Sequence, residues 1–155
     1  MTPSRGIPET IHASCVVVGE AGLLIRGASD AGKSSLAREI IFHAAQAGRF
    51  SRLVSDDRTR VQALHGRLVA WPTDPLAGCI EVRGVGIVRR PFEPSAVVRL
   101  IVDLSEDPER YPEELEGHAG LCGVMVPRLH MRTGAFSADI ALGRLSGVCD
   151  TVVTL

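Results

Sequence analysis

A phosphate-binding loop is the strongest chemical signal in the sequence. Residues 27–34 match the pattern G-x-x-x-x-G-K-[ST] at every fixed position. In such a loop backbone N–H groups surround phosphates, the lysine reaches the terminal phosphates, and the final hydroxyl reaches a magnesium ion. Lys33 is the only lysine among 17 basic residues, so a chain that otherwise uses arginine keeps a compact ammonium here. The pattern predicts a nucleotide site formed by Gly27, Ala28, Ser29, Asp30, Ala31, Gly32, Lys33, Ser34 and Ser35.

Carboxylates that could face this loop follow two different apolar stretches. Asp56 and Asp57 come after residues 50–55, and Asp103 ends the stretch at residues 96–103. A phosphate site needs such groups to hold magnesium or to take a proton from an attacking hydroxyl. In ordinary P-loop NTPases an apolar strand ending in Asp supplies the second magnesium contact, which favours Asp103. Adjacent aspartates also commonly open a turn, so the pattern leaves these alternatives open.

A second unusual stretch covers residues 79–90. Glu81 and Arg83 are two positions apart, so in a strand they would project from the same face. Gly84 and Gly86 bracket one residue, which indicates backbone that bends or admits a close neighbour. Taken by itself, this pattern favours an exposed strand face that carries an ion pair.

The elements that must position these groups can be read from periodicity. An apolar strand at residues 11–19, which begins near His12, turns at 19–22 into the strand 22–27 that feeds the loop. Without further information His12 is more simply a strand-end histidine than a group near the phosphates. A helix follows at residues 35–48, because its apolar positions recur at helical spacing. Those core positions are Leu36, Ile40, Ile41, Ala44 and Ala47.

Further along, the sequence predicts a hairpin, a strand and a short helix. Residues 61–71 alternate and contain a turn signal at His65 and Gly66. Residues 121–127 are typical of one strand, and residues 137–145 of a helix. Together these elements indicate an α/β protein.

Composition limits the function classes. At 155 residues the chain is long enough for one domain, which we expect at residues 10–155 after a flexible arm at 1–9. A formal net charge of −1 gives no support for a nucleic-acid or membrane partner. The sequence has neither an apolar membrane span nor an apolar signal core near its start, which predicts a cytoplasmic protein. Four widely spaced cysteines predict free thiols rather than zinc ligands or disulfides: Cys15, Cys79, Cys122 and Cys149.

Four segments, in this order, resemble the catalytic domain of HPr kinase/phosphorylase. They are His12, the loop at 27–34, residues 53–57 and residues 80–88. The last segment, I-E-V-R-G-V-G-I-V, is similar to the family signature I-E-I-R-G-x-G-I-I, which unrelated P-loop proteins lack. The resemblance covers roughly residues 9–140. It implies a mixed-sheet P-loop kinase domain like that of phosphoenolpyruvate carboxykinase, in a short form without the family's N-terminal regulatory domain.

The resemblance also implies an activity. The chain would be an ATP-dependent protein-serine kinase that phosphorylates HPr, the phosphocarrier protein of the sugar phosphotransferase system. Family members form hexamers, so a homo-oligomer is implied as well. Asp57 would take the proton from the target serine, and Ser34 with Glu81 would hold Mg²⁺, while Asp103 would be only a structural strand end. The other implied catalytic residues are His12, Lys33 and Arg110, and the implied substrate or signature positions are Asp56, Arg83, Gly84, Gly86 and Arg132.

Two departures from the family pattern matter. Asp30 stands where the family usually has glycine; Asp tolerates a left-handed backbone, so we expect an outward side chain whose charge could weaken nucleotide binding. The family's dephosphorylation loop, similar to P-V-R-P-G-R-N, is represented only by residues 131–135 with Arg132. The reverse phosphorylase activity therefore does not follow from the resemblance. Two alternatives are a small-molecule P-loop kinase that uses Asp103, and a regulator that binds ATP without transferring phosphate.

Overall fold

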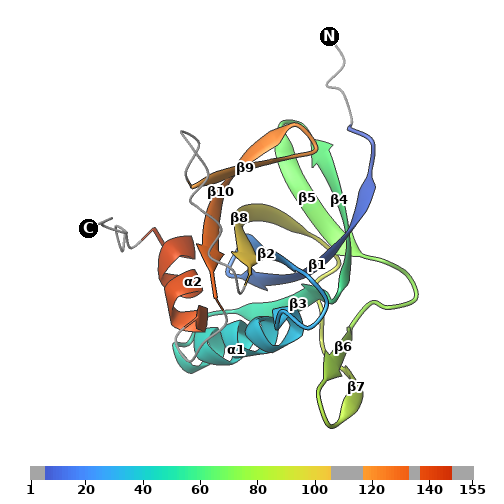
Figure 1. Cartoon of the computed structure of the whole chain (residues 1–155), viewed down its shortest axis with the longest axis vertical. Helices are drawn as coiled ribbons and strands as arrows, with labels where there is room; N and C mark the ends of the chain where they lie inside the picture. The colour runs from blue at the N-terminus through green and yellow to red at the C-terminus, as the bar shows by residue number, and fades with distance from the viewer. Residues whose placement is uncertain (1–5, 106–116, 133–136, 148–155) are drawn as a thin grey trace.

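The computed structural model describes residues 6–105, 117–132 and 137–147. Their elements run in the order shown in Figure 1. The strands are β1 (Glu9–Val18), β2 (Ala21–Gly27), β3 (Ser51–Ser55), β4 (Arg58–Leu64), β5 (Arg67–Pro72), β6 (Cys79–Val82), β7 (Gly86–Arg89), β8 (Ala96–Leu104), β9 (His118–Leu121) and β10 (Val124–Met131). The helices are α1 (Lys33–Gln46) and α2 (Ser137–Leu145).

One mixed sheet of eight strands dominates the described part of the chain. Its order is β2-β1-β4-β5-β8-β10-β9, and β3 pairs with β1 beside β4. The β2–β8 and β8–β10 pairs are parallel, and the remaining pairs are antiparallel. Because β2 pairs with both β1 and β8, the strands β2, β1, β4, β5 and β8 close into a ring. The predicted α/β class with a mixed sheet is confirmed.

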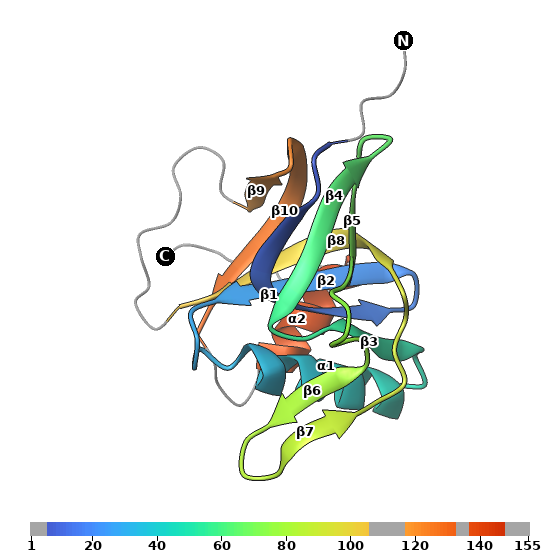
Figure 2. The ribbon, with the colours of Figure 1, turned by 90° about the vertical axis from the view of Figure 1, so that its right-hand side faces the viewer.

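The central strands β1, β2 and β8 are buried on both faces, which explains their continuous apolar sequence. One face, including Val16, Leu23 and Leu100, packs against α1 and α2. The other face, including Cys15 and Leu24, fills the interior of the ring. The two helices lie next to each other on one side of the sheet (Figure 2), so the chain has two apolar layers that share one set of strands.

Helix α1 differs slightly from its predicted span. Leu36, Ile40 and Ala44 are buried as expected, but Ala37 is buried too and Ala47 is exposed. The reason is that the helix stops at Gln46, so Ala47 no longer follows the helical period. The next residue, Gly48, takes a left-handed conformation (φ 74°), which is a common way to end a helix.

Two hairpin turns have the same backbone form. The predicted turn between β4 and β5 is confirmed, with φ values of 51° at His65 and 77° at Gly66. The prediction of one strand over residues 121–127 is wrong, because the chain reverses at Cys122 and Gly123 (φ 51° and 77°) to form the β9–β10 hairpin. Two consecutive residues with positive φ match the twist of antiparallel strands.

The stretch 79–90 forms a separate hairpin, β6–β7, which projects from the body of the molecule (Figure 2). Buried Ile80 anchors it in the apolar layer under the helices. β6 ends at Val82, so Arg83 belongs to the turn. The same-face prediction had assumed that Arg83 lies in the strand with Glu81. Gly84 and Gly86 have φ values of 81° and 114°, which confirms the predicted bend.

Part of the predicted N-terminal arm is paired with the sheet. The Gly6 N–H donates to the carbonyl of Ala63 at 3.1 Å, and the Gln62 amide donates to the Gly6 carbonyl at 2.7 Å. Glu9 already belongs to β1. Within the described residues, neither helix has the length and apolar character needed to cross a membrane.

Candidate active site

The predicted phosphate loop lies between the end of β2 and the start of α1. Gly32 precedes the helix with φ 96°, a conformation that glycine adopts readily and other residues avoid. No side chain caps the first turn of α1. The backbone N–H groups at this helix N-terminus, together with the helix dipole, therefore suit an anion such as a phosphate.

Gly27 allows the loop to pack closely on the end of β8. A Cβ at this position would lie 3.0 Å from the Leu104 carbonyl oxygen and 3.0 Å from the Ala31 Cβ. A larger residue would push the loop away from the strand that supports it.

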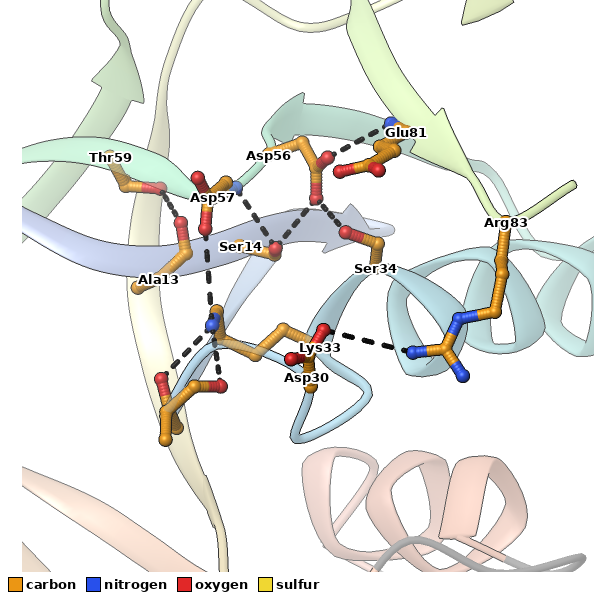
Figure 3. A network of polar contacts seen from close by, with 12 residues as sticks. Ala13, Ser14, Asp30, Lys33, Ser34, Asp56, Asp57, Thr59, Glu81 and Arg83 are labelled. Carbon is orange, nitrogen blue, oxygen red and sulfur yellow. Dashed lines mark hydrogen bonds and ion pairs between the residues drawn. The ribbon is translucent and has the colours of Figure 1, made fainter. Parts of the chain in front are cut away.

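Lys33 lies across the loop with its side chain only 6% exposed. Its Nζ donates to the carbonyl oxygens of Gly27 and Ala28, each at 3.0 Å, and lies 3.9 Å from Oδ1 of Asp57 (Figure 3). A buried ammonium needs such partners to offset its desolvation. Lys33 is thus the positive charge that faces the exposed carboxylate of Asp57.

Asp56 is a buried carboxylate that joins three elements. Its Oδ1 accepts hydrogen bonds from the hydroxyls of Ser14 at 2.8 Å and Ser34 at 2.7 Å. Its Oδ2 accepts one from the backbone N–H of Glu81 at 3.1 Å. Asp56 therefore fastens β1, the start of α1 and β6 around one point (Figure 3).

Asp57 points in a different direction from its neighbour. Its φ of 62° reverses the chain after β3, and its side chain is 61% exposed. Its backbone is fixed by β1: its N–H donates to the Ser14 hydroxyl at 3.2 Å, and its carbonyl accepts from the Ala13 N–H at 3.0 Å. Of the two adjacent carboxylates, Asp57 is the one open to a reactant.

A cavity of about 210 Å³ connects the loop, β6 and the residue after β3. Its lining combines cationic groups with oxygen donors, the chemistry that a magnesium-bound polyphosphate requires. Among the described residues no cluster of three His, Cys, Asp or Glu side chains forms a closed metal site, and Mg²⁺ commonly takes only one or two carboxylates beside phosphates and water. The cavity is lined by Ser29, Asp30, Gly32, Lys33, Ser34, Ser35, Asp57, Glu81 and Arg83.

Asp30 has the left-handed backbone that its position in the loop predicts, with φ 68°. Its side chain is 91% exposed and lies 3.9 Å from the guanidinium of Arg83, itself 86% exposed. The expectation of an exposed side chain is confirmed, but Asp30 also lines the cavity. Its charge therefore lies beside the expected position of the phosphates.

Asp103, the competing magnesium ligand, is occupied elsewhere. Its two oxygens accept hydrogen bonds from Nε and Nη2 of Arg26, at 2.7 and 2.8 Å, and from Nε of Arg128. Burial raises the pKa of the Asp103 carboxyl, but the hydrogen bonds from both arginines outweigh burial and lower it overall. The hydrogen bond to Asp103 likewise raises the pKa of Arg26. The carboxylate does not line the cavity, and its geometry fits a structural ion-pair cluster.

The structure does not bring every predicted site residue to the cavity. His12 is exposed and lies opposite Arg58 in the β1–β4 pair, outside the described cavity lining. Arg132 follows β10, Gly84 lies in the β6–β7 turn and Gly86 begins β7, and all three are outside that lining. Arg110 lies outside the described residues.

Ser14 is the residue that sequence reasoning missed. It is a buried hydroxyl inside an apolar strand, and nothing in the local pattern distinguishes it from a core position. The described cysteines Cys15, Cys79 and Cys122 are free thiols and do not line the cavity, and Cys149 lies outside the described residues.

Comparison with known proteins gives one consistent family. Residues 7–127 match the family model described as the HPr serine kinase C-terminal domain. HPr kinase/phosphorylases from Clostridium tetani and Clostridium beijerinckii are each 39% identical to this chain, over 85 and 82 residues. The matched parts cover 54% and 52% of this chain but only 26% and 25% of those relatives, about a quarter of their length.

A solved structure extends the comparison to the fold. The HPr(Ser) kinase/phosphatase from Coxiella burnetii superposes with a TM-score of 0.72 over 91% of this chain and 99% of the solved one. The sequence identity is 22%, so this likeness shows a shared fold.

Proposed function

The chain belongs to the HPr serine kinase C-terminal domain family, and from this premise we propose that it transfers the γ-phosphoryl group of ATP to a serine of HPr. HPr is the phosphocarrier protein of the sugar phosphotransferase system, and we propose that the reaction takes place in the cytoplasm. One observation supports the proposal most strongly: the exposed carboxylate of Asp57 faces the ammonium of Lys33 across the phosphate loop. This pair presents a base for a hydroxyl and a cation for a phosphate side by side.

The nucleotide phosphates would bind the loop and the start of α1. Backbone N–H groups at the helix N-terminus and the ammonium of Lys33 supply preorganised positive charge where negative charge develops during transfer. Arg83 lines the same cavity and adds a second cation. Preorganised charge is the main contribution that a protein makes to phosphoryl transfer.

Ser34 and Glu81 are the proposed magnesium ligands. The Ser34 hydroxyl gives its hydrogen to Asp56, so its oxygen lone pairs remain for a cation. Glu81 lines the cavity and is exposed at the end of the anchored strand β6. When bound, Mg²⁺ neutralises charge on the phosphates.

Asp57 is the proposed general base. As the serine oxygen bonds to the γ-phosphorus and the bond to ADP breaks, the serine proton passes to the Asp57 carboxylate. Asp56 is unsuited to this role because it is buried and its oxygens already accept three hydrogen bonds. His12 and Arg110 remain predicted catalytic residues on the basis of the family resemblance alone.

The proposal is limited to the forward reaction. Only the part around Arg132 is recognisable from the family's dephosphorylation loop. By resemblance to hexameric family members we also propose a homo-oligomer. Light scattering after gel filtration tests that assembly, with the mass of six chains expected and the mass of one chain as the contrary result.

A transfer assay tests the proposed function. The purified chain is incubated with Mg²⁺, γ-labelled ATP and HPr, and the modified residue is identified by mass spectrometry. We expect label on a serine of HPr, and no label with Lys33→Met. Nucleotide binding without transfer to HPr would instead identify a nucleotide-sensing regulator, and label on a small molecule would identify a metabolite kinase.

A further inference from the structure

Ser14 is a fully buried hydroxyl that contacts both adjacent aspartates. Its Oγ lies 2.8 Å from Oδ1 of Asp56 and 3.2 Å from the backbone nitrogen of Asp57 (Figure 3). Both distances are compatible with hydrogen bonds. A single side chain on β1 thus connects the buried carboxylate to the backbone of the exposed one.

The chemistry of the groups fixes the direction of these bonds. A backbone N–H can only donate, so the Ser14 oxygen accepts from Asp57. The hydrogen of the hydroxyl is then free to donate to the carboxylate of Asp56. Because the same Asp56 oxygen accepts from Ser34, a continuous chain of hydrogen bonds runs from the Asp57 backbone to the proposed magnesium ligand.

The backbone of Asp57 needs such support. A residue other than glycine at φ 62° is in an uncommon conformation that surrounding contacts must hold. Two contacts from β1 do so, the Ser14 hydroxyl on the N–H and the Ala13 N–H on the carbonyl. Without the hydrogen bond between the Asp57 N–H and the Ser14 hydroxyl, the chain of buried hydrogen bonds would no longer determine where the Asp57 carboxylate points.

We propose that Ser14 is a positioning residue, which fixes the backbone of Asp57 and the carboxylate of Asp56 so that the base and Ser34 keep their relative placement. This inference rests on the proposed function, in which Asp57 is the base. Two other hydroxyls have simpler partners: Thr59 and Ser51 each donate to one backbone carbonyl, of Ala13 and Ile41.

The test compares Ser14→Ala with Ser51→Ala in the full chain. Each variant loses a hydroxyl: Ser14→Ala removes the hydrogen bonds to Asp56 and Asp57, and Ser51→Ala removes one to a backbone carbonyl at the opposite end of β3 from Asp56. For Ser14→Ala we expect kcat to fall about ten- to a hundredfold, because small displacements of reacting groups have effects of this size. The Kd for magnesium-ATP should stay within about threefold, since the loop contacts of Lys33 remain. Ser51→Ala should keep the wild-type kcat.

A second pair of variants controls for misfolding. Ser14→Thr and Ser14→Val have the same shape and differ only in the hydroxyl, so any packing effect is shared. The Thr variant should have a kcat about tenfold or more above the Val variant. Equal kcat values in this pair, or a kcat for Ser14→Ala within twofold of Ser51→Ala, would overturn the proposal.

A measurement without substrate separates this inference from the proposed function. Hydrogen exchange at the Asp57 amide should be at least tenfold faster in Ser14→Ala than in Ser51→Ala. If the wild-type chain transfers no phosphate to HPr, the proposed function fails, while amide exchange still decides whether Ser14 holds Asp57. Unchanged exchange in Ser14→Ala would refute the positioning role even in an active enzyme.

Discussion

Replacing Asp103 with Asn should destabilise the protein and leave magnesium-dependent nucleotide binding intact. Asp103 accepts charge-assisted hydrogen bonds from Arg26 and Arg128, and it lies outside the cavity lining. The substitution keeps the shape of the side chain and removes its charge, so two guanidinium groups lose their counter-ion. The same change at a magnesium ligand would weaken magnesium-dependent nucleotide binding and change stability little.

The size of the loss can be worked from the structure. Removing one partner of a buried ion pair costs about 3–5 kcal/mol. The side chains of Arg26 and Arg128 are 30% and 22% exposed, so water recovers part of that cost. We therefore expect a loss of about 2–3 kcal/mol in the free energy of unfolding, which for a domain of this size lowers Tm by about 5–10 °C.

The assay is thermal unfolding together with ATP titration in the presence and absence of Mg²⁺. Glu81→Gln is the reciprocal variant, because Glu81 lines the cavity and is exposed. It should weaken magnesium-dependent binding about tenfold or more and change Tm little. Loss of magnesium-dependent binding in Asp103→Asn, with Glu81→Gln unaffected, would refute the reasoning and make Asp103 the metal ligand.

The pH dependence gives an internal check on the Asp103 ion pairs. Because the folded protein lowers the pKa of this carboxyl, its stabilising contribution is complete above the unfolded value near pH 4 and is lost as pH falls through the lower folded pKa. The difference in Tm between wild type and Asp103→Asn should be constant around pH 7 and should shrink below about pH 4. A difference that grows in acid would contradict this sign.

Two further predictions concern the phosphate loop and the core. Asp30→Asn keeps the left-handed backbone but removes a charge from the cavity lining, so ATP should bind more tightly. The gain should be at most about tenfold, because the side chain is 91% exposed. Weaker binding, measured by titration calorimetry, would show that Asp30 assists the nucleotide. Burial raises the pKa of the Cys15 thiol to about 12, so iodoacetamide at pH 8 should modify this residue only after unfolding, as followed by peptide mass spectrometry. Rapid modification in the native protein would contradict the buried placement.

Local patterns predicted the parts of the fold that depend on neighbouring residues. The strand, loop and helix around Lys33, the turn at His65 and the helix at residues 137–145 all follow from spacing and turn chemistry. The turn at Cys122 was missed because cysteine is not a usual residue for a left-handed turn. The pairing of β2 with β8, which closes the ring, could not be predicted either, because the paired residues lie 76–77 positions apart in the sequence and both strands are apolar on both faces.

In the candidate site, too, local patterns identify some residues and only long-range contacts reveal the others. Lys33, Ser34 and Asp57 were identified from motif and resemblance, and the structure brings all three to one cavity. The choice between Asp57 and Asp103 was not decided by pattern, because each stands at or just after the end of an apolar stretch. The difference lies in long-range partners: Asp103 meets two arginines from other strands, whereas Asp57 meets Lys33. Ser14 was missed for a related reason, since its importance comes only from residues more than forty positions away.

The most direct measurement of the central claim compares wild type with Asp57→Asn in transfer from magnesium-ATP to HPr, alongside the Kd for magnesium-ATP. A general base contributes about 10²–10⁴-fold to a rate, so we predict a loss of that size in transfer. Nucleotide affinity should stay within a few-fold, because the loop and Lys33 are unchanged. Transfer by Asp57→Asn at a rate near that of wild type would contradict the claim that Asp57 is the base of a protein-serine kinase.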